Sequence, residues 1–120
     1  MKITLLFFSV FLTTSLFGQD DLGYYNNGVN HYDAGEYEEA IIDYSRAIKI
    51  NPNYADAYYN RGLAYSYLGK YQEAIDDCTS AIKINPDDAQ AYNNRGYIYS
   101  GLGENQKAID DYTSAIKINP

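Results

Sequence analysis

The chain lacks several residue types on which whole classes of proteins depend. Its 120 residues include no Trp, one Cys, one His and three Pro. A single Cys cannot form an intramolecular disulfide, so cysteine usage gives no information about redox compartment. The sequence shows no phosphate-binding Gly loop, and its single His31 and single Cys78 do not belong to a metal-ligand cluster. The sequence therefore predicts a protein that is not an enzyme and that needs no metal or other cofactor.

Basic residues are also scarce. Nine Lys and Arg face 16 Asp and Glu, for a formal net charge of −7. Binding to a nucleic-acid backbone or to an anionic membrane surface requires a basic patch, so we expect no nucleic-acid partner. Three acidic pairs, Asp76-Asp77, Asp87-Asp88 and Asp110-Asp111, are expected to form a solvated face, because adjacent residues diverge on a helix.

Residues 1–18 differ from the rest of the chain. Lys2 is the only charge before an apolar run from Ile3 to Phe17, and Gly18 precedes a polar stretch. This pattern is typical of a secretory signal peptide, with cleavage expected after Gly18 or alternatively after Ser15. An uncleaved anchor is the competing interpretation, but the run is shorter than the roughly 20 residues that span a bilayer. We expect export to the periplasm or the exterior, without stable membrane insertion after cleavage.

One hexapeptide, Ala-Ile-Lys-Ile-Asn-Pro, occurs three times. The copies are Ala47–Pro52, Ala81–Pro86 and Ala115–Pro120, each 34 residues after the last. A fixed period of this length indicates an array of repeats. Because Pro disfavours the helical conformation at the preceding residue, each copy predicts the end of a helix. The repeat units are residues 21–54, 55–88 and 89–120, the last without its final two positions.

Each unit predicts two helices, over about its first 14 positions and about positions 17 to 30. A Gly at the same position in every unit is expected to end the first helix with a positive φ. Other small residues would let the two helices approach closely, while rings fill the space beside them. His31 falls in the aromatic register and Cys78 at a core position, so both are expected to pack inside. The glycines of the turn are Gly35, Gly69 and Gly103, and those of the helix interface are Gly28, Gly62 and Gly96.

These features resemble the tetratricopeptide repeat family. The motif is carried by residues 58–65, with Tyr58, Gly62 and Tyr65, by residues 69–74, with Gly69 and Ala74, and by the hexapeptide. The resemblance covers nearly all of the chain after residue 20. It implies an all-α fold, an α-solenoid of three tandem helix-turn-helix repeats that follows the signal peptide. It also implies a non-enzymatic scaffold whose concave surface, lined by the first helix of each unit, binds a peptide or a partner protein.

The candidate site residues lie on the first helix of each unit. Asn26, Asn60 and Asn94 share one position, which in this family can form a ladder that grips the backbone of a bound peptide. An amide suits this role because it both donates and accepts hydrogen bonds. Large side chains around the ladder would supply contact area. The competing interpretations are a solvated Asn and rings that pack against neighbouring repeats. The remaining candidates are Tyr25, Tyr59, Asn93, Val29, Leu63, Tyr97, Tyr32 and Tyr67.

The family's carboxylate clamp, which holds acidic chaperone tails, is not expected here. Its positions correspond to Tyr25, Val29, Asn60, Gln90 and Asn94, of which only Asn60 matches. The cations that would pair with a carboxylate are missing.

The alternative to a peptide scaffold is a self-associating structural module, or the N-terminal fragment of a longer repeat protein. The sequence stops at Pro120 without a polar helix to cover the third unit, and arrays usually carry such a cap. Tyr112, Ile116 and Ile118 would then form an uncovered face through which the chain could form a homo-oligomer.

Overall fold

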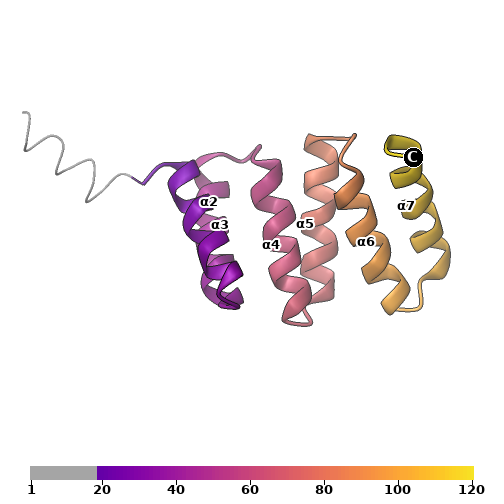
Figure 1. Cartoon of the computed structure of the whole chain (residues 1–120), viewed down its shortest axis with the longest axis horizontal. Helices are drawn as coiled ribbons and strands as arrows, with labels where there is room; N and C mark the ends of the chain where they lie inside the picture. Colours follow the sequence, from indigo (N-terminus) through magenta and orange to yellow (C-terminus); the bar gives the residue numbers. More distant parts are fainter. Residues whose placement is uncertain (1–18) are drawn as a thin grey trace, which may run out of the picture.

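The computed structural model describes residues 19–120, so the predicted signal peptide lies outside the described residues. The described part contains six helices and no strand, which confirms the all-α prediction (Figure 1). The helices lie close to the predicted spans, whereas the limits assigned to the repeat units remain predictions. Their bounds are α2 Asp21–Asp33, α3 Tyr37–Ile50, α4 Ala55–Tyr67, α5 Tyr71–Ile84, α6 Ala89–Gly101 and α7 Asn105–Ile118.

The helices end at the Gly and Asn-Pro positions that recur in each repeat. The turns within the three pairs contain Gly35, Gly69 and Gly103, with φ of 77°, 73° and 79°. These left-handed conformations cost a residue with a Cβ more than they cost Gly. At the other turn, the N–H of Asn51 donates to the carbonyl of Ala47 at 2.9 Å, and its Oδ1 accepts from the N–H of Asn53 at 3.2 Å. The Asn-Pro dipeptide therefore both ends α3 and starts the turn.

Glycine and ring positions bring the two helices of a pair together. In the first pair, a Cβ placed on Gly28 would lie only 2.6 Å from Cε1 of Tyr44. In the second pair, Gly62 faces the smaller Cys78, and the corresponding distance to Sγ is 3.5 Å. This confirms that a small residue permits the close approach and that the facing residue fills the space beside it.

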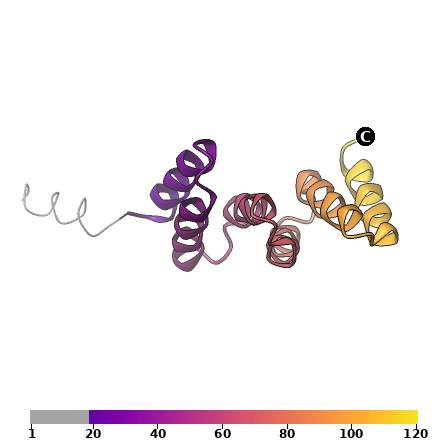
Figure 2. The same ribbon diagram turned by 90° about the horizontal axis from the view of Figure 1, so that it is seen from below.

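The contacts between pairs define an inner and an outer face. Helices α2, α4 and α6 contact one another in turn, whereas α3, α5 and α7 make no contact with one another. A row of pairs that touch on one side and separate on the other curves toward the touching side. The first helix of each pair therefore lines the concave face, and the successive pairs form the solenoid seen in Figures 1 and 2.

The interior is built mainly from alanine. The residues buried most completely include one larger side chain in each of the first two pairs, Tyr44 and Cys78. The predicted burial of Cys78 is therefore confirmed. Between the second and third pairs, Ile75 and Ile98 form a small cluster covered by Tyr65 and Tyr99. Among residues 19–120, no helix is long and apolar enough to cross a membrane.

Candidate functional site

An ion pair between a half-buried arginine and a buried aspartate joins the two helices in each of the last two pairs. Arg61 on α4 donates from Nε and Nη2 to the two carboxylate oxygens of Asp77 on α5, both at 2.7 Å. Arg95 on α6 holds Asp111 on α7 in the same way, at 2.8 and 2.7 Å. The expectation of a solvated acidic face is therefore wrong for Asp77 and Asp111, which are buried. Their neighbours in the chain, Asp76 and Asp110, are exposed. Because adjacent helical residues diverge, one of the two neighbouring aspartates on α5, and one of the two on α7, points inward.

Each of these arginines also reaches the preceding helix pair. Nη1 of Arg61 donates to Oγ of Ser45 on α3 at 3.0 Å, and Nη1 of Arg95 donates to Oγ1 of Thr79 on α5 at 3.0 Å. The guanidinium of Arg61 also lies 5.6 Å from the ring centre of Tyr58. The hydrogen bond from Arg95 to Asp111 raises the pKa of the guanidinium. Arg61 and Arg95 are the only Lys or Arg on α2, α4 and α6, so these concave helices offer no unpaired Lys or Arg.

In the first helix pair, the buried aspartate has different partners. Asn27 occupies the position of the arginines, and Asp43 is instead approached by Nη1 of Arg46 from its own helix at 3.5 Å. Nε2 of His31 lies 3.5 Å from Asp43, and Nδ1 lies 3.4 Å from Glu36. The side chain of His31 is 39% exposed and faces carboxylates, so its predicted packing in an aromatic core is wrong.

The three ladder asparagines have different surroundings. Asn26 is exposed. Nδ2 of Asn60 donates to the hydroxyl of Tyr25 at 2.9 Å, and Nδ2 of Asn94 donates to Sγ of Cys78 at 3.4 Å. Burial raises the pKa of Tyr25, and the hydrogen bond from Asn60 opposes this rise. Two of the three amides thus bridge neighbouring helix pairs.

Several candidate rings pack against other rings at the first junction, between the α2–α3 and α4–α5 pairs. Tyr25 stacks on Tyr54 with ring centres 5.0 Å apart. Tyr37 stacks on Tyr67 at 4.8 Å with an angle of 2° between the ring planes, and Tyr32 packs edge-on against both. These rings therefore pack between neighbouring repeats, which was the competing interpretation of the candidate tyrosines.

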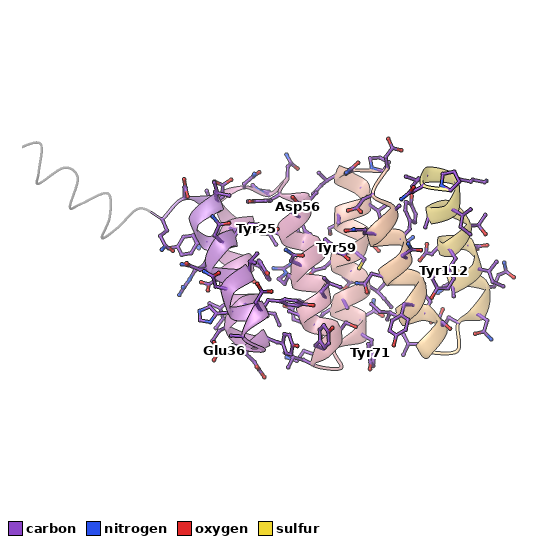
Figure 3. The ribbon with its side chains drawn as sticks, viewed as in Figure 1. Tyr25, Glu36, Asp56, Tyr59, Tyr71 and Tyr112 are labelled. Atoms are coloured by element: carbon purple, nitrogen blue, oxygen red, sulfur yellow. The ribbon has the colours of Figure 1, made fainter. Side chains whose placement is uncertain are left out.

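At the second junction, between the α4–α5 and α6–α7 pairs, the concave face is hollowed. A cleft of about 420 Å³ opens there, which we call the α4–α6 cleft. It brings together four of the candidate residues, and Tyr97 among them is 70% exposed. Figure 3 shows Tyr71 at the edge of the array where α4 passes into α5. The cleft is lined by Leu63, Ser66, Tyr67, Tyr71, Asn94 and Tyr97.

The remaining candidates do not line this cleft. Val29, Tyr59 and Asn60 are partly buried on α2 and α4, and Asn93 is exposed on α6. Burial raises the pKa of Tyr59, as it does for Tyr25. Part of the predicted set is thus packed at the first junction, and part lines the open second one. Tyr67 contributes to both, whereas Asn26 and Asn93 are exposed.

Sequence reasoning missed two lining residues, Ser66 and Tyr71. Tyr71 shares its position with Tyr37, which packs within the array, and nothing in a single repeat distinguishes the two. The buried ion pairs were missed as well. Their signal was present, since Arg61 and Asp77 recur 34 residues later as Arg95 and Asp111.

The family follows from the helix pairs and from the sequence together. A tetratricopeptide repeat model matches residues 55–88 and 89–120, and a second repeat model of this kind matches residues 28–69. The chain belongs to the tetratricopeptide repeat family. A search of curated proteins gave no match.

Solved structures of repeat proteins are similar over most of the chain. MamA is 32% identical with a TM-score of 0.84, over 88% of this chain and 61% of its own. The first repeat domain of Spaghetti (RPAP3), solved with the HSP90 peptide SRMEEVD, is 29% identical with a TM-score of 0.82, over 85% of this chain and 81% of its own. The Arabidopsis OM64 domain is 30% identical with a TM-score of 0.81, over 83% of each chain. The chain therefore spans less than two thirds of MamA.

Proposed function

We propose that this protein is a non-enzymatic scaffold that binds an extended peptide segment of a partner protein across the α4–α6 cleft. The observation that carries the proposal is the convergence of Leu63, Tyr67, Asn94 and Tyr97 on one cleft of the concave face. Exposed rings supply large contact area with little loss of side-chain entropy, and the Asn94 amide can pair with a peptide backbone.

The chemistry of the other side chains agrees with a binding role. Cys78 is fully buried, and burial raises its pKa to about 11, so it is not a nucleophile at neutral pH.

The expected ligand differs from the acidic peptide bound to Spaghetti. Arg61 and Arg95 are both committed to buried aspartates. A carboxylate-rich tail would find no unpaired Lys or Arg on the concave helices and would be repelled by a chain of net charge −7. We therefore propose a neutral or basic peptide with apolar side chains.

A selection from a random peptide library, followed by fluorescence anisotropy with the selected peptides, tests this function. Tyr97→Ala should weaken binding by roughly tenfold, because an exposed ring that contacts the peptide is removed. Ile42→Ala is the matched control, since Ile42 is a large apolar residue on the outer helix α3 and is 52% exposed. It should change affinity by less than about twofold. Failure to select any peptide, or equal affinities for the two variants, would exclude the proposed groove.

Self-association is the second candidate function. Ile109 and Ile116 on α7 are 56% and 63% exposed, whereas Ile75, the counterpart of Ile109, is 7% exposed beneath the next pair. Light scattering over a concentration series tests it. A mass that rises with concentration in the wild type, but not in Ile109→Lys, would support an interface through α7.

Export is proposed on the pattern of residues 1–18 alone, whose charge, apolar run and small residue fit a signal peptide. A mature N-terminus at Gln19, measured by mass spectrometry of the exported protein, is the expected result. An intact Met1 would contradict cleavage.

A further inference from the structure

The two junctions of the array are built on the same positions but are filled differently. At the first junction, the ring of Tyr37 is covered by Tyr67 and by Tyr32. At the second junction, Tyr71 takes the place of Tyr37. The two covering rings are missing there, because the residues 34 positions after Tyr67 and Tyr32 are Gly101 and Ser66.

The missing rings leave open space beside Tyr71. A Cβ placed on Gly101 would meet nothing within 4 Å. A second cleft, of about 240 Å³, lies there and shares Tyr71 and Tyr97 with the α4–α6 cleft. No aromatic ring within residues 19–120 pairs with Tyr71 or Tyr97, and both side chains are exposed, at 45% and 70%. We call this space the Gly101 cleft; it is lined by Tyr71, Tyr97, Ile98, Ser100, Gly101 and Leu102.

We infer that the Gly101 cleft binds an aromatic side chain of the partner peptide, tyrosine above all, stacked on Tyr71 as Tyr67 stacks on Tyr37. The inference rests on the proposed peptide-binding function and specifies its anchor. The first junction shows what fits this geometry, namely a tyrosine ring with its centre 4.8 Å from the facing ring and nearly parallel to it. Such an offset stack is a favoured arrangement of aromatic pairs.

The lining of the cleft agrees with a tyrosine in particular. Ile98 and Leu102 supply apolar contacts for the ring, and Ser100 supplies a hydroxyl that can pair with a phenol. Because Tyr97 also lines the α4–α6 cleft, a peptide lying there would be able to place one side chain in the Gly101 cleft without leaving the groove.

The test uses N-acetyltyrosinamide as the probe, with N-acetylleucinamide as the matched aliphatic compound, in titrations followed by NMR of the ¹⁵N-labelled protein. In the wild type, the tyrosine probe should produce saturable shifts of the Gly101 and Ser100 amides, with an affinity roughly tenfold above that of the leucine probe. Gly101→Tyr should abolish these shifts by placing an internal ring on Tyr71. It should also raise Tm by about 5 °C, because it restores a stack and removes a helical Gly.

Two further variants keep the result independent of folding. Gly101→Ala also removes the helical Gly but leaves the cleft open, so it should raise Tm and still bind the tyrosine probe. Tyr67→Gly removes the ring that stacks on Tyr37 but leaves Tyr32 edge-on against it, and it should create a second set of saturable shifts around Tyr37. Absence of saturable shifts in the wild type, or unchanged shifts in Gly101→Tyr, would overturn the inference.

The peptide selection separates this inference from the function on which it rests. Selected peptides that lose affinity with Tyr97→Ala but carry no aromatic residue would leave the groove in place and overturn the aromatic anchor. Selected peptides that share one aromatic position, and that Gly101→Tyr weakens at least tenfold while Gly101→Ala does not, would support both.

Discussion

At the scale of single residues, the residue that faces the interface glycine decides how much room a Cβ would have there. Gly28 lies against the ring of Tyr44, whereas Gly62 lies against the smaller Cys78. The sequence places Tyr and Cys at one repeated position, and the structure shows that the exchange changes the space available opposite the glycine.

Gly28→Ala should therefore lower the free energy of unfolding by about 2 kcal/mol, because the new methyl group collides with the Tyr44 ring and forces the core to shift. Gly62→Ala should lie within about 1 kcal/mol of the wild type, because its tightest contacts are 3.3 Å and the gain in helix propensity offsets them. Urea unfolding of the two variants measures both values. Equal losses of unfolding free energy in the two variants would show that the residue facing the glycine does not determine the cost of the substitution.

The buried thiol of Cys78 should make stability depend on pH. Its pKa is raised to about 11 by burial, whereas an exposed thiol ionises near 8.5. In the interval between these values the unfolded chain loses a proton that the folded chain keeps. The stabilising contribution is thus complete below about pH 8.5 and is lost as pH rises toward 11.

Cys78→Ala lacks this titration, so the difference in unfolding free energy between wild type and variant should shrink by about 2 kcal/mol from pH 8 to pH 10.5. The tyrosines titrate in both proteins and cancel in the difference, except for Tyr59, whose pKa Cys78 helps to raise. A constant difference across this range, measured by urea unfolding, would contradict a buried protonated thiol.

At the scale of elements, the helix pairs are held with unequal strength. The Arg61–Asp77 pair is bidentate with both contacts at 2.7 Å, whereas Asp43 in the first pair has partners no closer than 3.5 Å. Removing one member of a buried pair leaves the other charge without compensation, which costs far more than loss of an exposed pair.

Asp77→Asn should cost about 3 kcal/mol, and Asp43→Asn about 1 kcal/mol, in thermal or urea unfolding. Asp76→Asn, next to Asp77 in the chain but exposed, is the control and should change stability by less than about 0.5 kcal/mol. The double replacement of Arg61 by Met and Asp77 by Leu should recover most of the loss, since no buried charge remains. Similar losses for Asp76→Asn and Asp77→Asn would restore the solvated-face interpretation.

The elements were also what the sequence predicted best. Repetition of Gly69, Pro86 and the alanines at one period fixes helix ends and helix faces without knowledge of the neighbours. The site was harder, because each ring recurs at a helical position whose partners come from another repeat. Whether Tyr71 is covered depends on Gly101, 30 residues away, and whether Asp77 is solvated depends on Arg61 on the facing helix.

At the scale of the whole molecule, each helix pair touches only its neighbours, so stability is a sum of units and junctions. Helices α4 and α5 form the pair with neighbours on both sides. Native-state hydrogen exchange should show the slowest amides in α4 and α5, exchanging roughly tenfold or more slowly than those of α2 and α7. Uniform protection along residues 19–120 would indicate that the array opens as one block.

The contact from Arg61 back to Ser45 has a consequence for how such an array can lengthen by gene duplication. The second and third units each carry an arginine that reaches the preceding unit. All three units carry, as Ser45, Thr79 and Thr113, the hydroxyl position that a following arginine can use. A duplicated gene segment that encodes one unit would thus generate a junction whose two sides already match. The array could lengthen in a single genetic event, without compensating substitutions elsewhere.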